Sequence, residues 1–310
     1  MKDTDLVLVT HPDPGAVARS ALALARGPIR WCRLDDPGAE AATVWFSAGP
    51  MPEADLTLPR LRWIHSGWAG VESWFRRPEW APGVTLTRTV GDYPQRLAQY
   101  VFGYLLAHEL GVPETLRQME EALWRRFIPG SLAGRRLLIV GMGAAGKEVA
   151  AVGRALGMIV GGVRRRPRRA DRARGIRSPA DLPGLLPRAD FVVSLLPHTE
   201  ETESFWNEAR FAAMAEEATF VNVGRGVSVD EAALLRGLRR GRPGFAILDV
   251  FREEPLPVDH PLRREPHLWV TPHIAGVGSI PMMAEAFVRN WNRYRAKQRL
   301  FHTVDRRRGY

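Results

Sequence analysis

A glycine-rich turn at residues 141–146 has the spacing of a loop that binds a dinucleotide. It directly follows the apolar run 137–140 and opens a helix-like stretch, which is the context this motif requires. Gly141 permits a tight turn, Gly143 lets the backbone approach a pyrophosphate, and Gly146 lets the helix pack closely on the strand. A glycine turn without a ligand is the alternative. The predicted cofactor contacts are Gly141, Met142, Gly143, Ala144, Ala145 and Gly146.

Three consecutive arginines, Arg164, Arg165 and Arg166, end the next apolar run, where proteins that bind NAD carry an acidic residue. A carboxylate there would repel a 2′-phosphate. A guanidinium binds it through charge-assisted hydrogen bonds of roughly 1.5–3 kcal/mol each. We therefore predict NADPH as the preferred cofactor, with NAD possible, and Arg164 and Arg165 as its contacts. Arginines that only reflect an arginine-rich composition are the alternative.

Three later segments carry polar residues that strand formation does not require. Residues 221–226 and 249–257 directly follow apolar runs, and residues 271–276 lie at a strand-to-loop junction. Ligands of open α/β sheets bind at the carboxyl ends of the strands, so polar residues there are candidates for a site. Each of them alone is equally well explained as an ordinary surface or core residue.

With these segments the chain resembles the D-isomer-specific 2-hydroxyacid dehydrogenases, and among them the glyoxylate/hydroxypyruvate reductases of type A. The motifs that carry the resemblance follow one another in order over nearly the whole chain. They are residues 65–72, the glycine turn, Leu195-Leu196-Pro197 with Thr199 and Thr202, the three polar segments, and the ending at residues 304–310.

The resemblance implies an α/β fold of two domains. A Rossmann cofactor domain with a doubly wound parallel sheet, residues 97–274, is inserted into a flavodoxin-like substrate domain formed by residues 1–96 and 275–310. It further implies a cleft between the domains and a homodimer. The expected reaction is the NADPH-dependent reduction of a small 2-oxo acid, glyoxylate or hydroxypyruvate, to the 2-hydroxy acid.

The catalytic residues of the family match Arg225, Glu254 and His273, and the chemistry of the reaction agrees with these types. A 2-oxo acid presents a planar carboxylate beside a ketone, which the guanidinium of Arg225 can bind in a bidentate manner while polarising the carbonyl. As hydride reaches the carbonyl carbon, the oxygen needs a proton, and His273 is suited to donate it. Glu254, bonded to the far ring nitrogen, favours the imidazolium.

The resemblance also assigns the remaining contacts. The nicotinamide carboxamide is expected on Asp249, and the substrate carboxylate on the backbone of Ala69 and Gly70. Bulky indoles of Trp45 and Trp68 are expected to limit the pocket to small acids, with core packing as the alternative. Outside the glycine turn, the expected cofactor contacts are Arg164, Arg165, Leu196, Pro197, Val223, Gly224, Arg225, Asp249 and His273. The expected substrate contacts are Trp45, Trp68, Ala69, Gly70, Arg225 and His273.

Two sets of strands must position these residues. In the first ninety residues, short β-type runs alternate with helical or turn material, at residues 6–9, 43–46, 61–65 and 84–87. Beyond a helix-like face at residues 97–108, apolar runs alternate with helices, at residues 137–140, 158–163, 191–196, 219–223 and 245–250. Continuously apolar strands indicate a parallel sheet covered by helices. The last helix-like stretch, residues 282–298, is expected to return to the first domain.

Length and composition restrict the class of protein. The 310 residues suffice for two domains, and no apolar stretch approaches the ~18 residues of a membrane span. The polar opening lacks the core of a secretion signal, so we expect a cytoplasmic protein with no membrane partner. Cys32 is the only cysteine and the chain shows no metal-ligand spacing, so neither an internal disulfide nor a bound metal is expected.

The net charge of +10 raises the question of nucleic acid. Lysine occurs only at positions 2, 147 and 297, so 41 of the 44 basic residues are arginine, a bias that raises the isoelectric point without forming a patch. The basic run at residues 164–177 has no interleaved aromatics and no recognisable reading helix, so no nucleic acid partner is expected. A corepressor-like interaction protein that senses a dinucleotide, built on the same fold, is the main alternative to an enzyme.

Overall fold

The computed structural model describes residues 5–49, 52–53, 56–173 and 175–306. The first four residues, the last four of the predicted ending motif, and Arg174 of the basic run lie outside the described residues. The chain divides into two compact units, one formed by Met1–Tyr93 with Gly278–Tyr310 and the other by Pro94–Val277. The division predicted from the sequence lies at 96/97 and 274/275.

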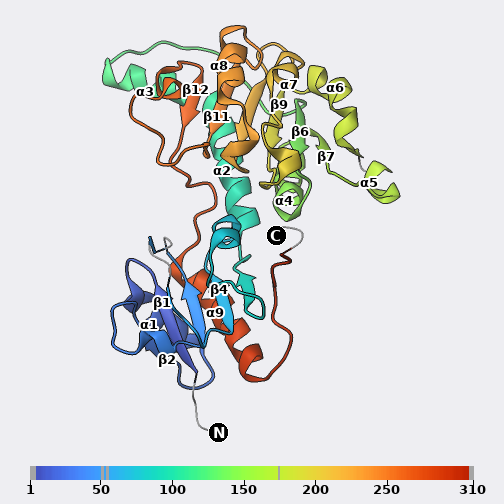
Figure 1. The fold of residues 1–310 in the computed structure, drawn as a ribbon. Helices are drawn as coiled ribbons and strands as arrows, with labels where there is room; N and C mark the ends of the chain where they lie inside the picture. Colours follow the sequence, from blue (N-terminus) through green and yellow to red (C-terminus); the bar gives the residue numbers. More distant parts are fainter. Residues whose placement is uncertain (1–4, 50–51, 54–55, 174, 307–310) are drawn as a thin grey trace. The chain divides into compact units, whose positions relative to one another are not determined.

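The first unit is built on a five-stranded parallel sheet with the order β2-β1-β3-β4-β5, the order of flavodoxin-like folds (Figure 1). Its strands are β1 (Leu6–Thr10), β2 (Arg30–Cys32), β3 (Val44–Ser47), β4 (Trp63–Ser66) and β5 (Thr85–Arg88). Helices α1 (Pro14–Leu24) and α9 (Ile280–Arg295) pack against each other on one face. The C-terminal helix thus belongs to the unit that the N-terminal strand begins, as predicted.

Side chains that alternate along these strands form two cores, one on each face of the sheet. On the face covered by α1 and α9, the ring of Phe287 stacks on Phe46 and Trp63, with centroids 4.4 Å and 5.2 Å apart. On the opposite face, Trp45 meets Trp74 edge to face, with centroids 4.9 Å apart. Large aromatic side chains therefore hold both faces of the small sheet.

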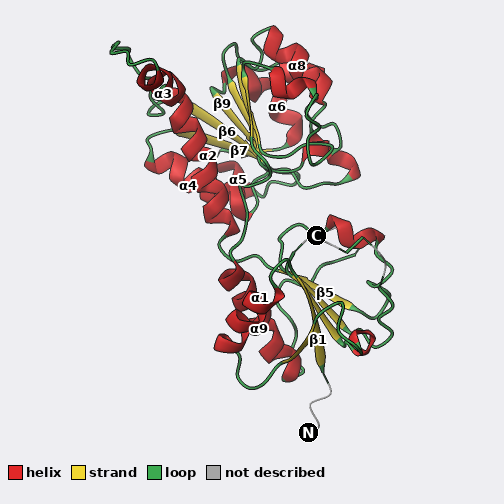
Figure 2. Cartoon of the chain, turned by 90° about the vertical axis from the view of Figure 1, so that its left-hand side faces the viewer, coloured by secondary structure: helices red, strands yellow, loops and turns green. Residues whose placement is uncertain are grey.

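The second unit contains a seven-stranded parallel sheet with the order β12-β11-β10-β9-β6-β7-β8. The strands are β6 (Arg136–Val140), β7 (Ile159–Val163), β8 (Ile176–Arg177), β9 (Phe191–Ser194), β10 (Thr219–Asn222), β11 (Phe245–Leu248) and β12 (Leu268–Val270). Helices flank both faces of this sheet (Figure 2). The helices of this unit are α2 (Tyr93–Glu109), α3 (Val112–Glu120), α4 (Ala144–Ala155), α5 (Arg169–Ala173), α6 (Leu182–Leu185), α7 (Glu208–Ala212) and α8 (Glu231–Arg239).

The strand order confirms the predicted doubly wound parallel sheet. Strands follow one another outward from β6 to β8 on one side and from β9 to β12 on the other, so the order reverses between β6 and β9. Loops after two such strands leave in opposite directions and open a crevice at the carboxyl edge of the sheet. The glycine turn follows β6, and the polar segments follow β10, β11 and β12, all at this edge.

One part of the second unit does not cover its sheet. Helix α3 and the segment that follows it, residues 121–131, extend away from the sheet in both views (Figures 1 and 2). We call residues 112–131 the arm. No helix in the described part of the chain is both long enough and apolar enough to cross a membrane.

Candidate functional site

The glycine turn between β6 and α4 has one open position and two crowded ones. A Cβ atom on Gly141, whose φ is +115°, would lie 2.7 Å from the Leu195 carbonyl oxygen, and one on Gly146 would lie 2.5 Å from the Gly141 carbonyl oxygen. A Cβ atom on Gly143 would meet no atom within 4 Å. Gly143 therefore faces free space beside the first turn of α4, where unpaired N–H groups attract an anion. The turn fits the pyrophosphate of a dinucleotide.

Loops at the switch point pack directly on one another. A Cβ atom on Gly224, in the loop after β10, would lie 2.6 Å from the Leu196 carbonyl oxygen in the loop after β9. Leu195 in that same loop contacts the glycine turn. The predicted cofactor contacts Leu196 and Gly224, with Pro197 and Val223 beside them in sequence, thus lie at neighbouring strand ends of one unit.

The arginines at the end of β7 already pair with acids. Arg164 donates from Nη1 to Oδ2 of Asp171 at 2.9 Å, and Arg165 donates from Nη1 to Oε2 of Glu201 at 3.0 Å. Both arginines follow Val163, the last residue of β7, so they lie at the carboxyl edge. The described structure thus provides two cations at the position where a 2′-phosphate is expected. Each guanidinium can exchange its carboxylate partner for a phosphate.

His273 and Glu254 form a hydrogen-bonded pair. Nδ1 of His273 lies 2.7 Å from Oε2 of Glu254, while Oε1 of Glu254 accepts a hydrogen bond from the Phe251 N–H at 2.9 Å. The imidazole is half exposed, so its other nitrogen can meet a ligand. This geometry orients the ring as a general acid requires.

The pair shifts the pKa of both partners. Burial by itself raises the pKa of Glu254, but the hydrogen bonds from His273 and the Phe251 N–H outweigh it and hold the pKa below 4.5. The hydrogen bond to Glu254 raises the pKa of His273 above 6.5, against the opposing effect of burial. Both groups are therefore charged between pH 4.5 and 6.5. The stabilisation of the fold by the pair is lost as the pH falls through the lowered pKa of Glu254, or rises through the raised pKa of His273.

Asp249 holds the backbone that carries His273. The φ of His273 is +55°, a left-handed conformation that is strained for this residue type. Its N–H donates to the Asp249 carbonyl oxygen at 3.0 Å, and the buried Asp249 carboxylate accepts from the N–H groups of Ile274 and Ala275 at 2.8 Å and 2.9 Å. Asp249 thus organises the loop that carries His273, a role that was not predicted from the sequence. Its predicted contact with a carboxamide stays a prediction.

Arg225 lies close to the pair. Its positive charge acts on the pKa of both Glu254 and His273, lowering each. Gly226 packs so tightly on Phe251 that a Cβ atom there would overlap the Phe251 carbonyl group. The loop that carries Arg225 therefore lies against the loop that leads to Glu254. The three residues that the sequence singled out come together in one unit.

The predicted substrate contacts of the first unit have two different environments. Trp68, Ala69 and Gly70 lie in the loop after β4, and Trp68 is exposed. Trp45 is fully buried, packs on Trp74, and donates from its indole N–H to Oγ1 of Thr10 at 3.0 Å. The prediction that Trp45 lines a substrate pocket is therefore wrong, because its position on β3 directs it into the core of the sheet.

Two further residues support the site and were not predicted. Thr271 donates from Oγ1 to Oδ1 of Asp249 at 2.6 Å, and the hydroxyl of Tyr100 lies 2.5 Å from Oγ1 of Thr271. Thr271 stands in a polar segment that the sequence analysis named, so its position was a usable signal. Tyr100 lies on α2, and its place in the apolar pattern of that helix does not distinguish it from an ordinary core residue.

Comparisons with known proteins show what the chain is similar to. Residues 102–275 match a family model described as D-isomer specific 2-hydroxyacid dehydrogenase, NAD binding domain. The chain is 30% identical over 287 residues to glyoxylate/hydroxypyruvate reductase A of Yersinia enterocolitica, with 91% of each chain covered.

Solved structures extend the likeness to nearly the whole chain. One is a D-isomer specific 2-hydroxyacid dehydrogenase from Xanthobacter autotrophicus in complex with NADPH and MES, with a TM-score of 0.85, 31% identity and 99% of each chain covered. Another is an NADPH-dependent glyoxylate/hydroxypyruvate reductase from Sinorhizobium meliloti in complex with NADP and sulfate. Its TM-score is 0.84, its identity 28%, and the match covers 99% of this chain and 100% of that one.

Proposed function

The chain belongs to the D-isomer specific 2-hydroxyacid dehydrogenases, and on that premise we propose that it reduces glyoxylate or hydroxypyruvate to the 2-hydroxy acid with NADPH. The observation that carries this proposal is the pair formed by His273 and Glu254, 2.7 Å apart, with the charge of Arg225 acting on both. A bidentate cation beside an oriented, protonated imidazole suits a planar carboxylate next to a ketone.

The residues act on different atoms of the substrate. Bound NADPH supplies the hydride that reaches the carbonyl carbon. Arg225 binds the carboxylate and polarises the carbonyl oxygen. His273 donates its proton to the carbonyl oxygen as negative charge develops there, and Glu254 stabilises the imidazolium until that step. In the reverse reaction, neutral His273 accepts the proton from the hydroxyl group.

The preference for NADPH rests on Arg164 and Arg165. Both guanidinium groups stand at the end of β7, and the related proteins from Xanthobacter autotrophicus and Sinorhizobium meliloti hold NADPH and NADP in their structures. A phosphate would replace Asp171 and Glu201 as partner of these arginines.

The proposal includes a homodimer that forms through the arm. Trp124 is 95% exposed and Ile128 is 97% exposed, values far above those expected for large apolar side chains of a monomer. The arm holds three glutamates and three arginines, so it is neutral in a chain of net charge +10. A two-fold interface brings the same patch from both copies together, and a neutral patch of mixed charge avoids repulsion there. A second copy is therefore the partner that fits.

A panel of 2-oxo acids tests the activity. Oxidation of NADPH and of NADH is followed with glyoxylate, hydroxypyruvate, pyruvate and 2-oxoglutarate, for the natural chain and for His273→Gln. We expect turnover with the two small acids, and a decrease of about 10²–10⁴-fold in the variant while NADPH still binds. A protein that binds NADPH but turns over none of these acids would instead support the dinucleotide-sensing alternative.

A further inference from the structure

Three successive carbonyl groups in the loop after β4 each accept a hydrogen bond from a side chain. The Gly67 carbonyl oxygen accepts from the hydroxyl of Tyr93 at 2.9 Å, and that of Trp68 accepts from Oγ of Ser66 at 3.1 Å. The Ala69 carbonyl oxygen accepts from Nη1 of Arg88 at 2.9 Å. All of these residues belong to the first unit. The side chains thus fix the direction of three consecutive peptide groups.

The N–H groups of the same loop are left to a ligand. Gly67 donates to the Ser47 carbonyl oxygen at 2.6 Å and Trp68 donates to Oγ of Ser66 at 3.2 Å. Within the described residues, the N–H groups of Ala69 and Gly70 have no acceptor. Successive backbone N–H groups that are held in place and unpaired form a site for an anionic oxygen.

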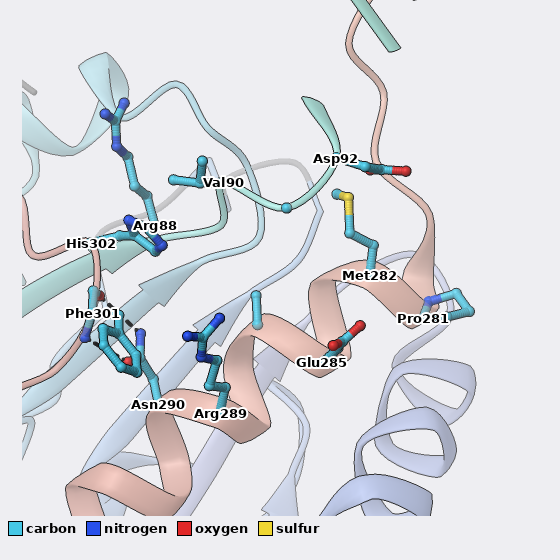
Figure 3. Close-up of a pocket in the computed structure, with 12 residues that line it drawn as sticks. Arg88, Val90, Asp92, Pro281, Met282, Glu285, Arg289, Asn290, Phe301 and His302 are labelled. Atoms are coloured by element: carbon cyan, nitrogen blue, oxygen red, sulfur yellow. Dashed lines mark hydrogen bonds between the residues drawn. The ribbon is translucent and has the colours of Figure 1, made fainter. Parts of the chain in front are cut away.

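Arg88 reaches the loop from the wall of a separate cavity. This cavity of about 430 Å³ lies between the end of β5, helix α9 and the segment after it, and Arg289, Glu285 and His302 also line it. Figure 3 shows the Arg88 side chain directed away from Arg289 and Glu285. The backbone N–H of Arg88 donates to the His302 carbonyl oxygen at 3.2 Å, which anchors the base of the side chain.

We propose that Arg88 and Tyr93 are positioning residues for the carboxylate of the substrate. The bond from Arg88 to the Ala69 carbonyl oxygen fixes the peptide group that carries the Gly70 N–H, and the bond from Tyr93 to the Gly67 carbonyl oxygen fixes the peptide group at the start of the loop. Together they hold the loop so that the N–H groups of Ala69 and Gly70 face the ligand. The inference rests on the proposed function, because it concerns how the 2-oxo acid is bound. It assigns a role in the affinity for the substrate carboxylate to two side chains that bind the loop and not the substrate.

The test compares four variants with the natural chain. Arg88→Met and Tyr93→Phe each remove a donor to the loop, and Arg88→Lys keeps a cationic donor. Arg289→Met is the matched control, because Arg289 lines the same cavity and makes a cation–π contact with Phe301 at 4.4 Å. Measured quantities are kcat, the KM for glyoxylate, the KM for NADPH, and the Kd of oxalate for the NADPH-loaded enzyme by calorimetry.

We expect Arg88→Met and Tyr93→Phe to raise the KM for glyoxylate and the Kd of oxalate by about ten-fold, as the loss of one well-placed hydrogen bond predicts. The kcat and the KM for NADPH should stay within about two-fold, and Arg88→Lys should restore part of the affinity. Arg289→Met should behave as the natural chain does. Thermal unfolding confirms that each variant is folded. If Arg88→Met does not fold, Tyr93→Phe, which loses only a hydroxyl group, still tests the inference.

Two results would overturn the inference. If Arg88→Met and Tyr93→Phe match Arg289→Met in the oxalate Kd, the donors do not position the loop, although the reductase activity stands. If they lower kcat and NADPH affinity together with glyoxylate affinity, they act on the fold as a whole. A natural chain that reduces no 2-oxo acid and binds no oxalate would instead refute the proposed function, and this inference with it.

Discussion

The hydrogen bond between Glu254 and His273 decides the pH range in which the imidazole can donate a proton. Glu254 raises the pKa of His273 above 6.5, whereas burial and the charge of Arg225 lower it. Reduction of a 2-oxo acid needs the protonated ring, so the rate should fall as the pH rises through this raised pKa. The pair thus keeps the acid form available near neutral pH.

Replacing Glu254 by Gln tests this effect. The variant keeps an acceptor for the Phe251 N–H but removes the negative charge beside His273. The pKa of His273 should then fall, and the descending limb of kcat/KM for glyoxylate should move to lower pH. Profiles of kcat/KM against pH for the two proteins measure the shift. If the descending limb stays at the same pH while kcat falls, Glu254 only orients the ring of His273.

Arg164 carries a second prediction at the scale of a residue. Replacement by Gln removes the cation without placing a second acid beside Asp171, which lies 2.9 Å from the guanidinium. The ratio of kcat/KM with NADPH to that with NADH should fall by about ten-fold or more. Arg169→Gln, in the same basic run, is the control and should leave the ratio unchanged. An unchanged ratio in Arg164→Gln would remove this residue from cofactor selection.

At the scale of elements, tight packing between loops holds the proposed catalytic residues together. Gly226 follows Arg225, and its backbone lies against Phe251, three residues before Glu254. No other residue type has room at this contact, because every other side chain begins with a Cβ atom. The loops after β10 and β11 therefore keep a common position only while residue 226 is glycine.

Gly226→Ala should separate these two loops. We expect the free energy of unfolding to fall by about 1–3 kcal/mol, as in overpacked sites, and turnover to fall more than the affinity for NADPH. Urea unfolding and steady-state kinetics measure the two effects. Gly103→Ala is the matched control, because a Cβ atom on Gly103, in α2, would meet no atom within 4 Å. Equal behaviour of the two variants would contradict the proposed contact.

Sequence patterns gave residue ranges for the longer strands and none for the three shortest ones. Continuous apolar runs correctly predicted β6, β7, β9, β10 and β11, because the strands of a parallel sheet that helices cover on both faces are largely apolar. Strands β2, β8 and β12 span only two or three residues, too few for any period to appear. They lie at sheet edges, where pairing with a longer neighbour stabilises them.

At the scale of the whole molecule, the arm is the feature that an isolated chain does not explain. Its apolar side chains lie in contact with water, which costs about 25 cal/mol for each Å² that a partner could cover. The highly exposed Val258, outside the arm, is a single apolar residue of the ordinary surface kind. Several apolar residues gathered on one extended segment are what the proposed dimer interface would cover.

Self-association can be measured directly. Size-exclusion chromatography with light scattering should give twice the chain mass of 34.7 kDa for the natural protein. The double variant Trp124→Ser with Ile128→Ser should give a mass near that of one chain, whereas Val258→Ser should stay a dimer. A double variant that keeps the dimer mass would place the interface elsewhere on the chain.

Residue types and their order along the chain by themselves determined the family and the two parallel sheets, and they predicted the glycine turn as a cofactor site and Arg225, Glu254 and His273 as catalytic residues. The sheets and the turn follow from local rules, since turns and strand burial demand particular residues at particular spacings, whereas the three catalytic candidates follow from the resemblance to the family. Only the tertiary structure decided that Trp45 is buried, that Asp249 organises a loop, and that Arg88 and Tyr93 bind backbone carbonyl groups. The packing of the elements decides which side of a strand faces the core and which distant donor meets a given carbonyl group. The residues adjacent in the sequence do not determine that packing.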